Sequence, residues 1–289
     1  MDEAKTLMPG NMRGKVVLIT GATDGLGKYT ALELARLGAV VVIVGRKPAK
    51  TSSVEAWLRQ SSENPNVFHL LADLSDQTQL RRLAAEFRSR FERLDVLINN
   101  VGALFIRRQL SANGIEMTFA LNHLSHFLLT HLLLDMLAAS GPARIVNMSS
   151  IAHYFPGMNL ADLQGNRFYN GWLAYGQSKL ANLLFTYELA CRLDAGVTAN
   201  ALHPGYVATH FACNNGPFYE RFFNFAHLVA IPPEVGVRTL VYLASSPEVE
   251  SVTGKFFIRC KPAATSRAAR DLETAQRLWE VSQDMTGLV

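Results

Sequence analysis

The stretch Lys15–Gly27 (KVVLITGATDGLG) decides the fold. Its first half is apolar and rich in β-branched residues, which is typical of a short strand buried on both faces. A glycine-rich turn follows, and a helix-forming stretch then continues to Leu37, with Gly38 as its stop. A strand, a glycine-rich turn and a helix in this order place backbone N–H groups at a helix N-terminus, where they can bind a pyrophosphate.

The glycines of this turn are spaced G-x-x-x-G-x-G, which differs from the G-x-G-x-x-G dinucleotide fingerprint. Each glycine still lets the backbone approach a ligand closely. A plain turn without a ligand is the alternative, but the position between a buried strand and a helix favours a binding site. The residues predicted to line a cofactor here are Gly21, Thr23, Asp24, Gly25, Leu26 and Gly27.

A second buried strand, Ala39–Gly45, is followed at once by Arg46 and Lys47. At this strand end an acidic residue binds the ribose 2′-hydroxyl of NAD, whereas Arg accommodates the 2′-phosphate of NADP. No carboxylate occurs at the strand end, so the sequence predicts that NADP(H) is favoured over NAD(H), with Arg46 and Lys47 as cofactor-binding residues. Asp24 argues mildly against this preference, because its carboxylate would lie near the same phosphate.

Further short apolar runs predict the remaining strands, and helix-forming stretches separate most of them. This alternation indicates an α/β fold with a parallel sheet. The predicted strands are Val67–Ala72, Leu94–Asn99, Ala143–Met148, Val197–Leu202 and Lys255–Phe257. The predicted helical stretches include Asp76–Phe91, Gly114–Ala139 and Ser266–Val289.

Polar and small residues follow the carboxyl ends of these strands, which is where ligands bind in open α/β sheets. Asp73 would either cap the next helix or accept a hydrogen bond from an adenine amino group. Ser149 and Ser150 follow the fifth strand and lie on the same rim. Asp73, Leu74, Asn99, Val101 and Gly102 follow the third and fourth strands on this rim, where a cofactor would lie. Pro204, Gly205, Val207 and Thr209 follow the sixth strand, where Pro and Gly force a turn.

Tyr175 and Lys179 are four residues apart in a helix-prone run, so their side chains lie on one helix face. A nearby cation favours the phenolate and lowers the tyrosine pKa from about 10 toward working pH. The pair is therefore a candidate acid/base that could trade protons. Taken alone, such a pair is usually solvated helix surface, and only the other motifs favour the catalytic interpretation.

The long apolar helix predicted over Gly114–Ala139 contains Asn122, His123 and His126. A buried asparagine in such a helix must find partners, and it would bend the helix or hold a water. We interpret both histidines as helix-surface or packed residues rather than ligands.

The composition is that of an enzyme-sized globular domain with 289 residues, 49% of them apolar, and a formal charge of +4. The positive charges are spread along the chain without a long Lys/Arg block, so the sequence does not indicate a nucleic-acid partner. The three cysteines have no metal-ligand spacing and are interpreted as reduced thiols, so no metal is expected. No apolar run is long enough to span a membrane. We expect a cytoplasmic protein of one domain over residues 1–289, with residues 1–13 as an N-terminal extension.

The segment of about residues 205–233 is long and rich in aromatic residues. A loop of this length in a compact domain is usually a lid or a binding loop. Its aromatic side chains would either line an apolar substrate pocket or pack as core, and the sequence does not decide between these.

Taken together, these motifs resemble the short-chain dehydrogenase/reductase family over nearly the whole chain, and more narrowly its retinol dehydrogenase branch. The family resemblance rests on Thr20-Gly21, Gly25-Leu26-Gly27, Asn99-Asn100-Val101-Gly102, Asn122, Ser150, Tyr175 with Lys179, and Pro204-Gly205 with Thr209. The resemblance to the branch rests on Thr30–Ala35, Leu121–Phe127, Phe168–Asn170, Ser178–Asn182 and Arg277–Ser282.

The resemblance implies a catalytic set of Asn122, Ser150, Tyr175 and Lys179. Tyr175 would give a proton to a carbonyl oxygen, or take one from an alcohol, and Ser150 would hydrogen-bond the same oxygen. Lys179 would lower the tyrosine pKa and hold the nicotinamide ribose. Tyr175 and Lys179 would thus both contact the cofactor. Asn122 would hold a water that links Lys179 to solvent. The segment Ile151–Ala174 makes the spacing between the serine and the tyrosine longer than in many members, so Ser149 remains an alternative to Ser150.

The same resemblance implies finer contacts and an overall architecture. Asn99 and Gly102 would line the cofactor, and Val207 and Thr209 the nicotinamide amide. The expected fold is a single-domain Rossmann-type α/β structure, a doubly wound parallel sheet of about seven strands with flanking helices. Self-association as a homodimer or homotetramer would use the helices that hold Asn122 and Tyr175.

The predicted activity is NADP(H)-dependent interconversion of an apolar aldehyde or ketone with its alcohol, with a retinoid, a steroid or another lipophilic carbonyl as substrate. Peripheral contact with a membrane stays open. The alternative is a catalytically silent NADP(H)-binding sensor or scaffold, which would not need Ser150, Tyr175 and Lys179 together. A nucleotide-sugar epimerase would need a larger C-terminal part, and nothing in the sequence points to a light-driven tetrapyrrole reductase.

Overall fold

A single mixed sheet forms the centre of the molecule in the computed structural model, which describes residues 10–205, 215–216 and 236–288. The strand order is β3-β2-β1-β4-β5-β6-β7-β8, and only β8 is antiparallel to its neighbour. The strands are β1 (Val16–Thr20), β2 (Val40–Gly45), β3 (Val67–Leu71), β4 (Val96–Asn99), β5 (Ala143–Met148), β6 (Val197–His203), β7 (Phe256–Ile258) and β8 (Lys261–Pro262). The order reverses between β1 and β4, as in a doubly wound fold.

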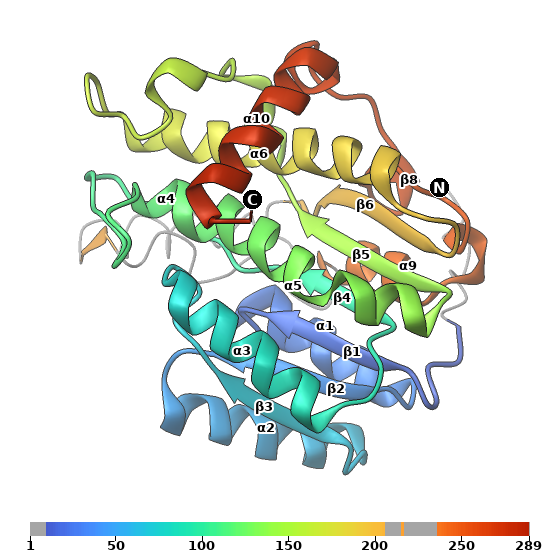
Figure 1. Ribbon diagram of the computed structural model, residues 1–289. Helices are drawn as coiled ribbons and strands as arrows, with labels where there is room; N and C mark the ends of the chain where they lie inside the picture. Colours follow the sequence, from blue (N-terminus) through green and yellow to red (C-terminus); the bar gives the residue numbers. More distant parts are fainter. Residues whose placement is uncertain (1–9, 206–214, 217–235, 289) are drawn as a thin grey trace, which may run out of the picture.

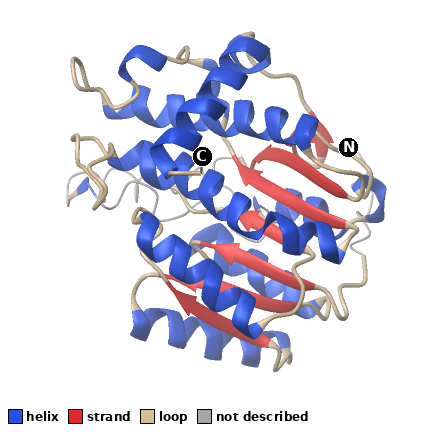
Figure 2. Cartoon of the chain, in the orientation of Figure 1, coloured by secondary structure: helices blue, strands red, loops and turns tan. Residues whose placement is uncertain are grey.

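Helices cover both faces of the sheet (Figures 1 and 2). On one face lie α1 (Gly25–Arg36), α2 (Pro48–Ser62) and α9 (Arg238–Ser245). On the other face lie α3 (Gln77–Arg90), α5 (Ser125–Ser140) and α6 (Gly171–Arg192), with α10 (Leu272–Thr286) packed outside α6. Short helical segments are α4 (Met117–Phe119), η1 (Ala120–Leu124), η2 (Ile151–Tyr154), η3 (Leu160–Asp162), η6 (Pro247–Val249) and η7 (Ala268–Arg270).

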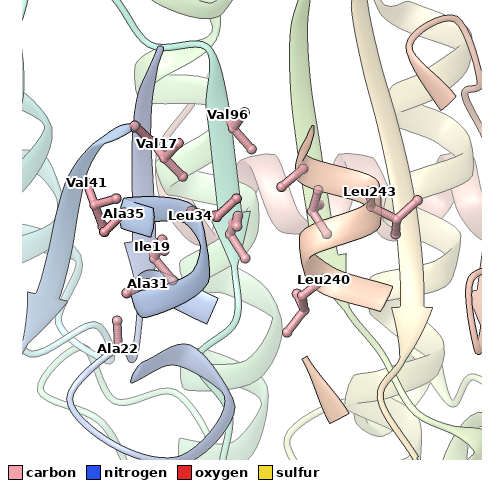
Figure 3. Packing of buried hydrophobic residues seen from close by; sticks show 14 of the residues in the cluster. Val17, Ile19, Ala22, Ala31, Leu34, Ala35, Val41, Val96, Leu240 and Leu243 are labelled. Carbon is pink, nitrogen blue, oxygen red and sulfur yellow. The ribbon is translucent and has the colours of Figure 1, made fainter. Parts of the chain in front are cut away.

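Alternate residues of the strands supply two separate cores. Val17 and Ile19 of β1 face α1 and α9, where Figure 3 shows them against Ala31, Leu34 and Leu240. Their neighbour Leu18 faces α3 and α5 instead, because successive side chains in a strand point to opposite faces. Both faces of β1 are therefore apolar, which explains the uninterrupted apolar run in the sequence.

The predicted doubly wound α/β fold is confirmed, with one more strand than expected. All seven predicted strands are present. The eighth, β8, has two residues, which is too short for any periodic pattern to predict. No described helix combines the length and the apolar character needed to cross a bilayer.

Two predicted helices are interrupted. Gly114 lies in a turn with φ +72°, so the predicted Gly114–Ala139 helix begins at Met117, and its stretch Ala120–Leu124 is π-helical. The tail predicted as one helix from Ser266 is divided by Asp271, whose carboxylate caps α10 by accepting from the Thr274 N–H.

The helix α10 crosses α6 and reaches α5 (Figure 1). Trp279 of α10 stacks edge-on against Phe127 of α5 at 5.2 Å and also contacts Phe185 of α6 at 5.9 Å between ring centroids. Arg192 at the end of α6 lies 4.5 Å above the Trp279 ring. The chain therefore covers part of the outer face of the two helices that were expected to pair with a second copy.

Candidate active site

The glycine turn between β1 and α1 is closed to side chains. A Cβ at Gly27 would lie 2.6 Å from both the Asn100 Nδ2 and the Gly21 carbonyl oxygen, and Gly21 has φ +63°. The Asp24 carboxylate caps α1 by accepting from the Gly25 N–H at 2.8 Å. The Gly25 N–H is therefore taken by Asp24, and the other N–H groups of the first turn of α1 form a helix N-terminus of the kind that binds a phosphate.

The end of β4 is tied to this turn by Thr20 and Asn100. The Thr20 hydroxyl accepts from the N–H groups of Asn100 at 2.9 Å and Val101 at 3.1 Å. The Asn100 amide donates to the carbonyl oxygens of Thr20 at 2.8 Å and Gly21 at 3.2 Å. Asn100 was not among the predicted site residues, although its place directly after a strand and opposite the glycine turn was a usable signal.

Asn99, the residue before it, points the other way. Its side chain is fully buried and donates to Thr130 Oγ1 at 3.0 Å and Asn147 Oδ1 at 2.8 Å. The expected contact of Asn99 with a cofactor would therefore be made by its backbone. Leu74 is likewise buried among the core residues, so its side chain packs against the protein and not toward the rim.

Charged residues surround the carboxyl ends of β2 and β3. Arg46 is exposed and its guanidinium lies 3.2 Å from an Asp73 carboxylate oxygen, while Lys50 pairs with Asp24 at 2.6 Å. Burial raises the pKa of Asp73, but hydrogen bonds from Ser75 and the Arg46 guanidinium outweigh it and hold the pKa below its usual value.

The helix cap expected of Asp73 belongs to another residue. Asp76 caps α3 by accepting from the N–H groups of Thr78 and Gln79. Asp73 instead accepts from the hydroxyl and the N–H of Ser75. The capping alternative for Asp73 is therefore wrong, and the carboxylate stays beside Arg46.

Ser150 and Tyr175 meet at the rim of β5. The Ser150 hydroxyl caps η2 by accepting from the Ala152 N–H at 3.2 Å, and it also hydrogen-bonds the side chain of Tyr175. Tyr175 lies on the second turn of α6, whose first turn is capped by Asn170. Both residues keep part of their surface exposed, whereas the Tyr175 hydroxyl itself is desolvated by the atoms around it.

Lys179 follows one turn later and is buried, with only 2% of its surface exposed. Its ammonium lies 5.6 Å from the centre of the Tyr175 ring and donates to the Met148 carbonyl oxygen at 3.3 Å. A Cβ at Gly102 would lie 3.0 Å from the same nitrogen. The ammonium is therefore held between β5, α6 and the loop that follows β4.

The neighbouring serine has a different environment. The Ser149 hydroxyl is buried and donates to the Lys179 carbonyl oxygen at 2.7 Å, so it joins β5 to the backbone of α6. Of the two serines, Ser150 is the one that hydrogen-bonds the Tyr175 side chain.

The pKa values differ from the sequence-based expectation. Burial raises the pKa of Tyr175 well above its ordinary value, and the Ser150 hydrogen bond offsets this only in part. Burial lowers the pKa of Lys179 to about 7. In the polypeptide alone, the burial of Tyr175 therefore outweighs any lowering of its pKa by Lys179. Tyr175 is instead held in its proton-donating form.

Asn122 lies in the π-helical stretch and is fully buried. Its side-chain oxygen accepts from the Ala103 N–H, and its amide donates to the Ala103 carbonyl oxygen and the Ser178 hydroxyl, each at 2.9 Å. The side chain thus holds the loop after β4 against α6. A water linked to Lys179, as predicted from the family resemblance, would have to use an atom not occupied by these bonds.

His123 and His126 are packed inside the protein and not on the helix surface. Both are fully buried. His126 Nε2 donates to the Val101 carbonyl oxygen at 3.0 Å, which holds the loop after β4 from a second side. Burial lowers the pKa of His123 to about 4, and burial together with the Lys179 charge places that of His126 well below its usual value.

The last predicted residues are described only in part. Pro204 and Gly205 follow β6 and are half-buried, and Gly205 has φ +92°. Val207, Thr209 and most of the predicted lid lie outside the described residues. Asn215 is described, and its side chain accepts from the Ile106 N–H at 2.8 Å and donates to the Leu104 carbonyl oxygen at 2.7 Å. This lid residue thus bonds to the loop after β4, which sequence reasoning did not foresee.

The comparison with protein families gives the class of the protein. The short chain dehydrogenase profile matches residues 15–219, which include the glycine turn and the Ser150, Tyr175 and Lys179 positions. The chain belongs to the short-chain dehydrogenase/reductase family. It is therefore an oxidoreductase with a fold that binds a nicotinamide cofactor.

Similar proteins agree with this class. Retinol dehydrogenase 12 of Mus musculus is 43% identical over 286 residues, which cover 95% of this chain and 87% of that protein. Retinol dehydrogenase 11 of Homo sapiens is 42% identical over 276 residues, with 95% and 86% covered. An uncharacterized protein from Mycobacterium paratuberculosis has a solved structure with a TM-score of 0.78 at 34% identity, covering 96% of both chains. The NADP active-site complex of RhlG from Pseudomonas aeruginosa has a TM-score of 0.69 at 26% identity, covering 86% of this chain and 96% of that one.

Proposed function

We propose that this oxidoreductase interconverts an apolar aldehyde or ketone and its alcohol with NADP(H), using Ser150, Tyr175 and Lys179 as its catalytic residues. The observation that carries the proposal is the meeting of Ser150 with Tyr175 at the strand rim, with Lys179 buried one helical turn away. A silent cofactor-binding protein would have no need for this combination.

The residues present fit a nicotinamide dinucleotide. Gly21 and Gly27 let the turn pack closely against Asn100 and Val101, where a Cβ would clash, and the N-terminus of α1 that follows is where a pyrophosphate would bind. At Gly102 a Cβ would lie 3.0 Å from the Lys179 nitrogen, so the glycine keeps a side chain away from the ammonium, from which a ribose hydroxyl would accept a hydrogen bond. The bound cofactor supplies or takes the hydride, and the protein supplies position and charge.

In the reducing direction, Tyr175 donates a proton to the carbonyl oxygen of the substrate. Its raised pKa keeps the phenol protonated over the neutral range, so the proton is present, and its transfer requires a neighbour that stabilises the phenolate. Ser150 donates a hydrogen bond to the same oxygen, so two hydroxyls meet the negative charge that develops there. The phenolate left on Tyr175 is stabilised when Lys179 carries its proton.

NADP(H) preference is supported by the charges near β2. Arg46 and Lys47 are both exposed where the adenosine ribose would lie, and an Arg at this position accommodates a 2′-phosphate. The phosphate would compete with Asp73 for the Arg46 guanidinium, while Lys50 neutralises Asp24, the carboxylate that would otherwise repel it. The related RhlG structure is named as an NADP complex.

An apolar substrate is supported by the segment between β5 and α6. Apolar side chains are exposed directly after Ser150 and one turn before Tyr175, where a hydrophobic ligand would cover them. They are Ile151, Tyr154, Phe155, Phe168, Trp172 and Leu173. The most similar proteins reported above are named retinol dehydrogenases, which supports a lipophilic alcohol or carbonyl of this kind. The cytoplasmic location stays a prediction.

The test is oxidation of NADPH, followed by absorbance, with a panel of apolar aldehydes and ketones and with NADH in parallel. We expect turnover with NADPH and a loss of at least about 100-fold in kcat in Tyr175→Phe, because the proton donor is removed. Binding of NADPH should stay within a few-fold. A Tyr175→Phe protein as active as the wild type would refute the mechanism.

A further inference from the structure

Buried polar side chains connect α10 to the backbone beneath Lys179. Ser282 of α10 lies 3.0 Å from His123 Nε2, and His123 Nδ1 lies 3.2 Å from Asn182 Oδ1. All three residues have no exposed surface. Buried polar groups are costly unless they are paired. Apolar side chains would fill the same space at lower cost, so these hydrogen bonds across three helical segments indicate a role other than packing.

The side-chain nitrogen of Asn182 is the centre of this row. It lies 2.9 Å from the Asn122 carbonyl oxygen, 3.0 Å from the Met148 carbonyl oxygen and 3.2 Å from His126 Nδ1. Three acceptors surround this atom, so an amide rotated by 180° would place oxygen against oxygen twice. The orientation of the Asn182 amide is therefore determined by its neighbours.

This orientation also determines the state of His123. Asn182 Oδ1 is an acceptor, so His123 Nδ1 must carry the hydrogen. The ring is then neutral, which agrees with the burial that lowers the pKa of His123 to about 4. His123 Nε2 is left as an acceptor, and the Ser282 hydroxyl divides its one hydrogen between this nitrogen at 3.0 Å and the Leu278 carbonyl oxygen at 2.7 Å.

The far end of the row is the acceptor of Lys179. The Met148 carbonyl oxygen receives both the Asn182 amide at 3.0 Å and the Lys179 ammonium at 3.3 Å. The Asn122 carbonyl oxygen, bound by the same amide, belongs to the π-helical turn whose side chain holds the loop at Ala103. Asn182 therefore binds the backbone on both sides of the lysine.

The geometry points to Asn182 as a positioning residue that holds the Met148 carbonyl oxygen and the Asn122 turn in place for Lys179, with His123 donating to its amide oxygen. This inference rests on the role proposed above for Lys179. Asn182 is not a catalytic residue, because it acts through the two carbonyl groups.

Replacing Asn182 by leucine should change Lys179 in a defined direction. The Asn182 N–H groups share the Met148 carbonyl oxygen with the ammonium, so removing them leaves that acceptor to Lys179 and favours its charged form. The titratable side chains nearest to Lys179 are Tyr175 on its own helix and His126 on α5, and both are neutral near pH 7. We expect the Lys179 titration to move up by about one pH unit.

The experiment is a pH titration of Lys179 by ¹³C NMR in protein labelled at the lysine Cε carbons, with the signal assigned by its absence in Lys179→Met. It needs no substrate or turnover, so a protein that reduced none of the carbonyls would still yield the result. The wild-type midpoint is expected near the pKa of about 7, and that of Asn182→Leu about one unit higher. The kcat of Asn182→Leu should fall about tenfold or more, because the Met148 carbonyl group and the Asn122 turn lose the amide that holds them in place around Lys179.

Thr186→Val is the matched control. Thr186 lies one turn along the same helix, is equally buried, accepts from Asn147 Nδ2 at 3.0 Å and donates to the Asn182 carbonyl oxygen at 2.6 Å. Its loss should lower stability as a buried hydrogen bond does, while the Lys179 midpoint stays at the wild-type value. An equal shift in both variants would overturn the inference, because it would then reflect loosened packing.

Two variants of His123 separate the hydrogen bond from stability. His123→Phe keeps the ring but removes the donor to Asn182, whereas His123→Asn is smaller but can place an N–H where Nδ1 was. We expect the phenylalanine variant to shift the Lys179 midpoint and the asparagine variant to restore it, even if the latter unfolds more easily. If the midpoint follows the melting temperature across these variants, or if Asn182→Leu and His123→Phe both leave it unchanged, the inference is wrong.

Discussion

Replacing Lys179 by methionine should stabilise the protein below neutral pH while abolishing activity. Lys179 is 2% exposed, and burial lowers its pKa from 10.5 to about 7. The folded protein therefore disfavours the ammonium relative to the unfolded chain. Methionine has a similar length and no charge, so it removes this cost at little loss of packing.

The magnitude and the sign follow from linkage. A difference of roughly 3.5 pKa units at about 1.4 kcal/mol each sets an upper limit of about 5 kcal/mol for the cost of the buried charge. Because the folded pKa lies below the unfolded one, this cost is complete below pH 7. It declines through the window from about 7 to 10.5 and vanishes above it. The loss of the Lys179 hydrogen bond to the Met148 carbonyl oxygen would subtract about 1 kcal/mol from the gain.

The assay is urea denaturation of wild type and Lys179→Met at pH 6, 7.5 and 9, with the exposed Lys255→Met as the control for a surface charge. The free energy of unfolding of Lys179→Met should exceed that of wild type most at pH 6, and the difference should shrink by about 1.4 kcal/mol per pH unit above 7. A difference that does not change with pH would refute the reasoning, because it would mean that Lys179 titrates alike in the folded and unfolded states.

Four further outcomes are expected. Arg46→Asp should move the ratio of kcat/KM for NADPH over NADH toward NADH by at least about tenfold, because it replaces the guanidinium near the 2′-phosphate by a carboxylate; an unchanged ratio would mean that the preference lies elsewhere. Ser150→Ala should lower kcat by about 100-fold, whereas Ser149→Ala should lower the free energy of unfolding by about 1 to 2 kcal/mol. The reverse pattern would show that Ser149 is the catalytic serine and Ser150 the structural one. Gly102→Ala should lower kcat about tenfold, because its Cβ would come within 3.0 Å of the Lys179 ammonium; retained activity would show that the lysine can give way. Because α10 covers part of the outer face of α5 and α6, we expect no dimer that uses this face. If sedimentation shows a dimer and mutations on this face abolish it, the expectation is wrong.

The sheet was predictable from the sequence because its signal is local. Val16–Thr20 and Val40–Gly45 are buried on both faces, so an uninterrupted β-branched run is enough to indicate them. Gly21 and Gly27 were predictable for the same reason, since the turn between a strand and a helix can be read in order. The two-residue strand β8 and the π-helical stretch Ala120–Leu124 carry no such signal.

Residues whose role depends on distant partners were less predictable. Asn99 and Asn100 are adjacent and identical in chemistry, yet one bonds inside the core and the other holds the glycine turn. The alternation of side chains along β4 decides this, and it depends on which face each neighbouring helix covers. The pKa of Tyr175 differs from the expectation for a similar reason. The sequence indicated a cation beside Tyr175, but it did not indicate that both side chains are buried.

The cost of burial is concentrated where the proposed chemistry takes place. Lys179 is buried with a lowered pKa, His126 is buried beside it, and Asn99 Oδ1 has no hydrogen-bond partner among the described atoms. All three lie on α5, α6 or β4, around the loop that begins at Asn100. A structure selected for stability alone would place apolar side chains there, as the same helices do further from the rim. Buried polar groups also occur elsewhere, as at Asp95 and Thr30, but those around Lys179 lie at the strand ends where ligands bind in such folds, which argues for a functional site there.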